Sequence, residues 1–174
     1  MNYKLHKALV PFIGLLLLVG CGKVSPDGLQ GKWKPVYVCF DTEDVLSGYR
    51  SVYDGPVDAH GGFTVLLIGM DHPDVQYKNQ AEMTGIRFFR QNGEDVFTTF
   101  HLDTPNKAIA KPLLYKIENG KLYREWPKGA FINCSPEVLE EGSGVFDEGA
   151  EFTILPDGQL RIGTDSDYVL YKRL

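Results

Sequence analysis

Hydrophobic residues recur along most of the chain in short runs that turn residues interrupt, a pattern typical of consecutive β-strands. The run 62–70 is almost continuously apolar, which favours a strand covered on both faces. The run 29–40 alternates instead, and a period of two predicts two distinct faces for its strand. These faces carry Trp33, Tyr37 and Cys39 on one side, and Val36, Val38 and Phe40 on the other.

Turn signals between the later runs predict hairpins. Asn-Gly, the dipeptide that two-residue hairpin turns favour, occurs at 92–93 and 119–120, each time between two hydrophobic runs. Pro156-Asp157-Gly158 marks a third hairpin, and the run 167–174 is expected to form the last strand. The best helix signal is 135–141, where a serine and a proline suit the N-terminus of a helix of about two turns.

Many short strands with tight turns predict an all-β fold. The 19 glycines and 10 prolines favour turns over long helices. Because the hairpins follow one another, we expect an antiparallel up-and-down meander barrel of about 8–10 strands, with one short helix. Its first and last strands would pair and leave no open sheet edge.

The first twenty residues differ from the rest. Lys4 and Lys7 precede an apolar run that is shorter than the ~20 residues of a membrane-spanning helix and contains Pro11, which predicts a secretory signal peptide. The run ends in Leu18-Val19-Gly20-Cys21, which resembles a bacterial lipobox. The resemblance implies that the chain is cut before Cys21 and that this residue carries several acyl chains, palmitate among them. Several chains suffice for stable anchoring in a bilayer.

The predicted organisation is a signal peptide (1–20), a lipidated tether (21–28) and a barrel domain (29–174). Loss of the signal peptide would change the net charge from −5 to −7. A negative protein has no basic footprint for nucleic acid and no attraction to anionic lipid, so attachment to the bilayer would rest on Cys21. Gly22, rather than an aspartate, follows the cysteine, and by resemblance to enterobacterial sorting rules this favours the outer membrane.

Both ends of the barrel domain resemble a known family. Gly31-Lys32-Trp33 is similar to the Gly-x-Trp signature of lipocalins, and Arg173 is similar to the basic residue that packs over that tryptophan. Together with the lipobox, these ends resemble the lipocalin-like lipoproteins of Bacteroidota. The resemblance implies that Trp33 and Arg173 close the barrel and are structural rather than catalytic.

Candidates for chemistry are few. The expected mature chain has three histidines, His60, His72 and His101. His72 lies between Asp71 and Asp74, which would suit a metal or an acid–base pair, but the same Asp-His-Pro-Asp sequence suits a plain turn. No nucleophile elbow, phosphate loop or dinucleotide fingerprint occurs in the sequence. We therefore expect no enzyme activity, no metal and no cofactor.

Aromatic residues, 12% of the chain, supply material for either a core or a pocket. An antiparallel barrel fills its interior with side chains or holds a ligand there. The ligand-pocket candidates are Tyr37, Phe97, His101, Tyr115 and Trp126. We expect a non-enzymatic binder of a small apolar ligand. The alternative is an envelope interaction module with a filled barrel, which presents loops such as 127–149 to a protein or glycan partner.

Two cysteines remain once Cys21 is acylated. Cys39 and Cys134 would lie in an oxidising compartment, where paired thiols tend to form disulfides. The other interpretation is two free thiols, with Cys39 acting as a small core residue.

Overall fold

The computed structural model describes residues 25–125 and 149–174. The expected signal peptide, Cys21, Trp126, Cys134 and the expected helix at 135–141 lie outside these residues. The predictions made for them therefore stay predictions. The helix that the structure does describe, α1 (Pro26–Leu29), overlaps the segment that the sequence assigns to the tether.

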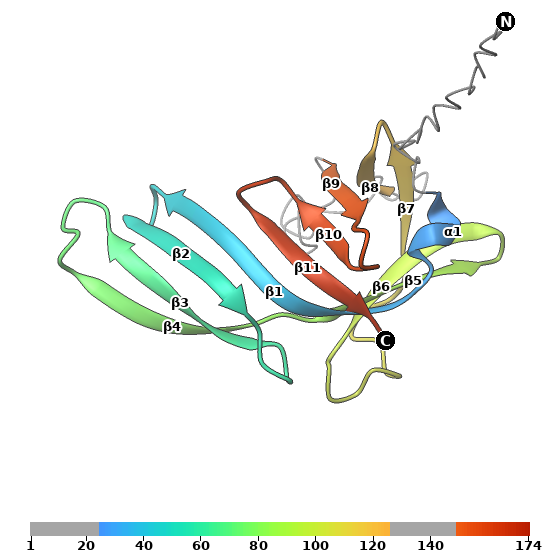
Figure 1. Cartoon of the computed structure of the whole chain (residues 1–174), viewed down its shortest axis with the longest axis horizontal. Helices are drawn as coiled ribbons and strands as arrows, with labels where there is room; N and C mark the ends of the chain where they lie inside the picture. Colours follow the sequence, from blue (N-terminus) through green and yellow to red (C-terminus); the bar gives the residue numbers. More distant parts are fainter. Residues whose placement is uncertain (1–24, 126–148) are drawn as a thin grey trace, which may run out of the picture.

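Most of the described residues form antiparallel strands (Figure 1). In chain order they are β1 (Gly31–Asp44), β2 (Tyr49–Pro56), β3 (Gly62–Gly69), β4 (Gln76–Glu82), β5 (Gly85–Gln91), β6 (Glu94–Phe100), β7 (Leu113–Glu118), β8 (Lys121–Glu125), β9 (Ala150–Ile154), β10 (Leu160–Gly163) and β11 (Tyr168–Arg173). The three predicted hairpins are confirmed as β5–β6, β7–β8 and β9–β10. Both Asn-Gly turns have positive φ at both residues, 53° and 85° at 92–93, and 51° and 78° at 119–120.

Eight of these strands form a closed barrel, as the sequence predicts. The order runs from β1 through β5, β6, β7, β8, β9 and β10 to β11, and β11 pairs with β1 again. The closing pair is antiparallel, with Trp33 opposite Arg173 and Cys39 opposite Tyr168. The first and last strands of the domain therefore leave no open edge in this part of the sheet.

Three strands leave the barrel, which the sequence does not predict. β11 occupies one edge of β1, so β5 and β2 share the other: residues 31–33 pair with β5, and 37–44 pair with β2. β3 and β4 extend this sheet outward, and β4 is its last strand. We call β2, β3 and β4, together with residues 37–44 of β1, the wing (Figure 1).

A β-bulge in β1 overturns the predicted face assignment. Pro35 pairs with Tyr171, but Tyr37 pairs with Leu170, so Val36 is an extra residue without its own partner. A bulge of one residue exchanges the two faces of the strand beyond it. Tyr37 and the next odd-numbered residue, Cys39, therefore lie on the opposite face from Trp33, not on the same face.

The expectation that β3 is covered on both faces is wrong. Phe63 and Val65 are buried, whereas Thr64 between them is exposed. β3 belongs to the wing, where the apolar side chains gather on one face of the sheet. Val38, Phe63 and Val65 form the centre of this cluster, which we call the wing cluster.

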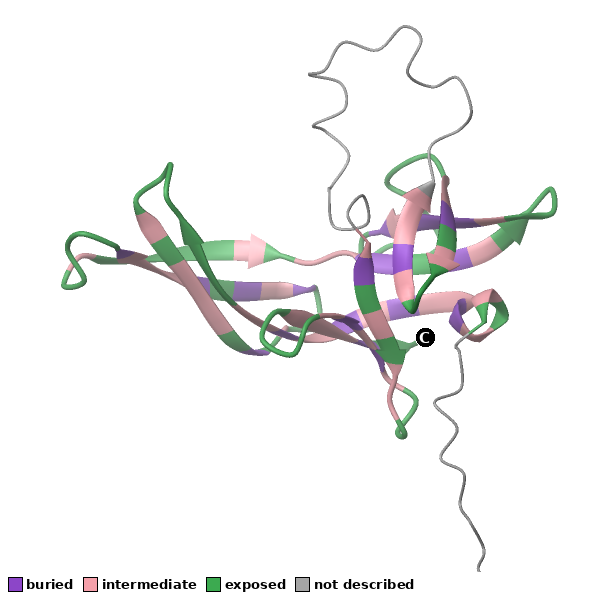
Figure 2. Ribbon diagram, turned by 90° about the horizontal axis from the view of Figure 1, so that it is seen from above, coloured by how far each residue is buried: buried purple, intermediate pink, exposed green. Residues whose placement is uncertain are grey.

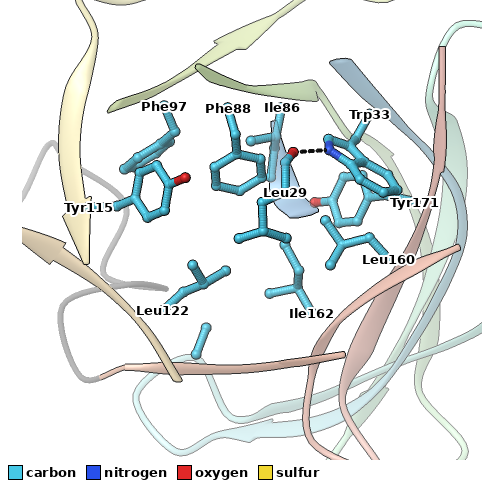
Figure 3. Packing of buried hydrophobic residues seen from close by; sticks show 11 residues of the cluster. Leu29, Trp33, Ile86, Phe88, Phe97, Tyr115, Leu122, Leu160, Ile162 and Tyr171 are labelled. Atoms are coloured by element: carbon cyan, nitrogen blue, oxygen red, sulfur yellow. Dashed lines mark hydrogen bonds between the residues drawn. The ribbon is translucent and has the colours of Figure 1, made fainter. Parts of the chain in front are cut away.

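A second cluster, the barrel core, fills the interior of the barrel (Figure 3). Its buried members are Leu29, Trp33, Ile86, Phe88, Phe97, Tyr115, Leu122, Ala150, Leu160, Ile162 and Tyr171. Burial of each large apolar side chain contributes about 1.5–3 kcal/mol, so this cluster is a main source of stability. Figure 2 shows buried segments throughout the barrel, while much of the wing is exposed or half-buried. Within the described ranges, no helix is long and apolar enough to span a bilayer.

Candidate functional site

One end of the barrel is closed by α1, Trp33 and Arg173. The Trp33 side chain is buried, and its Nε1–H donates to the carbonyl oxygen of Leu29 at 2.7 Å (Figure 3). The Arg173 guanidinium lies 4.5 Å from the centre of the Trp33 ring and donates to the carbonyl oxygens of Gln30, at 2.9 Å, and Gly28, at 2.8 Å. The last carbonyl groups of a helix have no N–H partner within the helix. Here the side chains of Trp33 and Arg173 donate the missing hydrogen bonds. The contact that the resemblance implies is present.

The other end of the barrel holds a cavity of about 510 Å³, which we call the mouth cavity. Its walls come from the middle of β1, the start of β5, the ends of β6 and β10, and the start of β11, all of which lie at one end of an antiparallel barrel. The described lining residues are Val38, Cys39, Phe40, Met83, Thr84, Ile86, Phe97, Thr99, Ile162, Gly163, Asp167, Tyr168, Val169 and Tyr171.

The mouth cavity separates the two apolar clusters. Its inner wall is made by members of the barrel core, such as Phe97 and Ile162. Its outer wall is made by Val38 of the wing cluster and by Phe40, which packs against that cluster. Val169 packs against both clusters. An apolar molecule in the cavity would therefore contact hydrophobic side chains of the barrel and of the wing.

The turn between β10 and β11 shapes one rim of the cavity. Gly163 has φ of 120°, and a Cβ atom there would lie 2.1 Å from the carbonyl oxygen of Asp167. Thr164 closes the turn, because its N–H donates to that same oxygen at 2.8 Å, while its Oγ1 accepts from the N–H of Asp167 at 3.0 Å. Only glycine fits this close approach without strain, and the turn places Asp167 at the mouth.

Polar groups are few in this lining. The Cys39 thiol donates to the carbonyl oxygen of Ser166 at 3.4 Å. Partial burial raises the pKa of Cys39, and the nearby carboxylates of Asp54 and Asp167 raise it further. The thiol is therefore protonated at neutral pH and is a poor nucleophile. Burial also raises the pKa of Tyr171, which keeps its hydroxyl neutral.

The structure separates the predicted pocket residues. Phe97 lines the mouth cavity. Tyr115 lies within the barrel core, and Tyr37 stacks on Tyr168 at 6.4 Å between ring centres while donating to Asp54 at 2.7 Å. His101 follows the end of β6, is exposed, and has its Nδ1 3.7 Å from Glu82. Trp126 is outside the described residues.

The other two histidines of the described residues lie on the surface. His60 Nδ1 is 2.6 Å from Asp103 Oδ1, and that carboxylate raises the pKa of His60. His72 is exposed in the turn between β3 and β4, where its carbonyl oxygen accepts from the N–H of Val75. No group of three or more histidine, cysteine or acidic residues in the described part of the chain is placed to hold a metal ion.

Sequence reasoning missed the cavity residues contributed by turns. Met83 and Thr84 join β4 to β5, and Asp167 precedes β11. The only sequence signal at Asp167 is the polar sequence 164–167, which is typical of a turn and carries no indication of what it borders.

No protein-family model, curated protein or solved structure matched this chain. Its function is therefore inferred from the geometry of the described residues.

Proposed function

We propose that the protein is an exported, lipid-anchored, non-enzymatic binder of a small apolar molecule, which it holds in the mouth cavity. The observation that carries this proposal is the cavity itself. Its volume of about 510 Å³ lies within the roughly 300–1,000 Å³ of small-molecule sites, and most of its lining is apolar. The lipobox and the lipocalin-like ends of the barrel domain support the envelope location and the binding role.

A fluorescence titration with N-phenyl-1-naphthylamine, a neutral apolar dye, tests the proposal. We expect the dye to gain fluorescence on binding to the mouth cavity. Thr99 lines this cavity and is half-buried, so Thr99→Trp should fill it and abolish the gain. The matched control is Thr153→Trp, which makes the same substitution at an exposed position of β9.

Equal dye binding by both tryptophan variants, or no binding by the wild-type protein, would contradict the proposal. Thermal unfolding of each variant shows whether it retains the fold. Native mass spectrometry of the protein purified from its own host would then identify the molecule that the cavity holds.

The wing supports a second candidate function, contact with a protein or glycan partner. The turn that joins β1 to β2 carries Val45 and Leu46 at the tip of the wing, where their side chains are 79% and 100% exposed. Between residues 41 and 84 the chain has eight acidic and two basic residues. A partner for this tip would therefore have an apolar pocket for Val45 and Leu46, surrounded by basic residues that complement the acidic wing.

A photoreactive side chain at position 46 tests this second function in living cells. We expect one discrete cross-linked product if the tip has a specific partner. The same group at Asn119, in the turn between β7 and β8, is the control for chance collisions. Matching products from both positions, or none from position 46, would exclude a partner at the wing tip.

A further inference from the structure

The charge at the mouth cavity indicates which apolar molecules it accepts. Asp167 is the one charged side chain among the described lining residues. Its Oδ1 accepts from the backbone N–H of Asp41 at 3.1 Å, and its Oδ2 accepts from the Ser166 hydroxyl at 3.1 Å. These bonds fix the carboxylate at the rim and leave lone pairs free, since an ionised carboxylate has about four acceptor sites.

A second carboxylate lies close by. Asp54 is opposite Cys39 in the pairing of β1 with β2, and its Oδ1 accepts from the Tyr37 hydroxyl. Asp54 is exposed and lies on the same face of the sheet as Tyr37 and Cys39, outside the cavity lining, so the charge at the cavity itself comes from Asp167. The rim therefore carries a negative potential.

Two arginines of the strands around the rim do not cancel this potential. Arg50 on β2 forms an ion pair with Asp41. Arg161 on β10 pairs with Asp165 and lies over the Tyr168 ring, 5.2 Å from its centre. Arg161 lies between Leu160 and Ile162, both of which belong to the barrel core, so its side chain is on the outer face of the barrel.

We infer that the mouth cavity selects apolar molecules with a cationic end, which the Asp167 carboxylate binds, over those with an anionic end. This inference rests on the proposed binding function and adds the ligand class. An anionic head group, such as the carboxylate of a fatty acid, would meet the Asp167 carboxylate at the rim. The apolar lining would hold the chain of the ligand so that its charged end lies beside this carboxylate, where opposite charges attract and like charges repel.

Displacement of N-phenyl-1-naphthylamine by three twelve-carbon compounds tests the inference. The compounds are dodecylammonium, 1-dodecanol and dodecanoate, each used below the concentration at which it aggregates. We expect dodecylammonium to bind tightest, dodecanol next and dodecanoate weakest. The ammonium and carboxylate compounds should differ by about tenfold or more in affinity, because their chains are the same and only the end group changes.

Substitutions at the rim identify the group responsible. Asp167→Asn keeps the size of the side chain and an acceptor for the Asp41 N–H. It should remove most of the difference in affinity between dodecylammonium and dodecanoate, while the affinity for dodecanol stays the same. The matched control is Asp74→Asn, which makes the same charge change at an exposed carboxylate in the turn between β3 and β4, outside the cavity lining, and should preserve the difference. Thr84→Lys adds a cation to the lining and should likewise remove the preference for ammonium, which gives a second test if Asp167→Asn does not fold.

The outcomes separate the two proposals. If dodecanol displaces the dye but dodecanoate binds as tightly as dodecylammonium, the inference on charge is wrong and the binding function stands. The inference on charge is equally wrong if the preference persists in both Asp167→Asn and Thr84→Lys. If neither the dye nor dodecanol binds, the binding function itself is wrong, and the inference falls with it.

Discussion

The guanidinium group of Arg173 lies over the Trp33 ring, and the two residues are also direct partners in the antiparallel pairing of β11 with β1. One pair therefore combines three tasks. It joins the last strand to the first, it covers the buried ring at the closed end of the barrel, and it satisfies carbonyl groups of α1. The mouth cavity is at the opposite end, so this pair is structural and lies away from the proposed ligand.

Trp33→Ala should lower the free energy of unfolding by roughly 3–5 kcal/mol, because it removes a large buried ring and the hydrogen bond to Leu29. Arg173→Ala should cost less, with a cation–π share of about 0.5–2 kcal/mol. Urea unfolding of both single variants and the double variant measures the coupling. Since the residues touch, their effects should not add, and clean additivity would remove the contact as a source of stability. Lys172→Ala, at a neighbouring exposed position, is the control.

Local signals explain what the sequence predicts correctly. An Asn-Gly turn needs only positive φ at two adjacent residues, so β5–β6 and β7–β8 can be located without knowledge of the rest of the fold. The apolar run at 168–171 and the Gly-x-Trp sequence similarly indicate the first and last strands of the barrel. Each of these elements is determined by a few neighbouring residues, so it can be predicted without knowing how the rest of the chain folds.

The wing and the cavity depend on relations that no single segment reveals. β4 is a polar edge strand whose residues are nearly all exposed, so it has no hydrophobic alternation to detect. The bulge at Val36 changes which side chains of β1 face the barrel interior, and it is visible only in the pairing with β11. Because the mouth cavity draws on five strands and two turns, Phe97 could be anticipated as a lining residue while Asp167 could not.

Tyr115→Phe should raise the free energy of unfolding by about 1 kcal/mol. The Tyr115 hydroxyl is buried and has no hydrogen-bond partner in the described part of the structure, and a buried polar group without a partner costs about 1–3 kcal/mol. Figure 3 shows this hydroxyl within the barrel core. Urea unfolding measures the change. Tyr37→Phe is the matched control, because it removes a hydroxyl that donates to Asp54, and it should not stabilise the protein. Equal effects of the two variants would contradict this explanation.

The stability of the protein should fall between about pH 10 and pH 12. Burial raises the pKa of Tyr115 from 10.0 to about 12, and the Asp95 charge adds to the effect. A folded-state pKa above the unfolded value gives a contribution that is present below pH 10 and is lost as the pH rises toward 12. The midpoint of urea unfolding, measured across this range, should decrease less steeply in Tyr115→Phe than in the wild type. Identical slopes would mean that Tyr115 does not contribute.

Cys21→Ala should remove the protein from the membrane fraction or leave it as an uncleaved precursor. The reason is the lipobox, whose cysteine supplies the thiol that is acylated. Fractionation of cells, with mass spectrometry of the N-terminal peptide, measures both outcomes. Cys39→Ala should stay in the membrane, which separates loss of the lipid from loss of any cysteine. Acylation and membrane retention of Cys21→Ala at wild-type levels would refute the lipoprotein prediction.

The pairing of Cys39 with Cys134 stays a prediction, because Cys134 lies outside the described residues. Cys39 is half-buried at the rim of the mouth cavity, and its thiol donates a weak hydrogen bond to the carbonyl oxygen of Ser166. The cysteines are 95 positions apart, and a disulfide that closes a loop of that length stabilises the folded protein by about 4–5 kcal/mol in the chain-entropy model.

If the bridge forms, peptide mapping of the exported protein without reductant should recover one pair of peptides joined through these two cysteines. Cys39→Ser should then lower the midpoint of urea unfolding of the oxidised protein while changing little in the reduced protein. Recovery of both cysteines as free thiols that react with an alkylating agent in the unfolded chain would show that the bridge does not form.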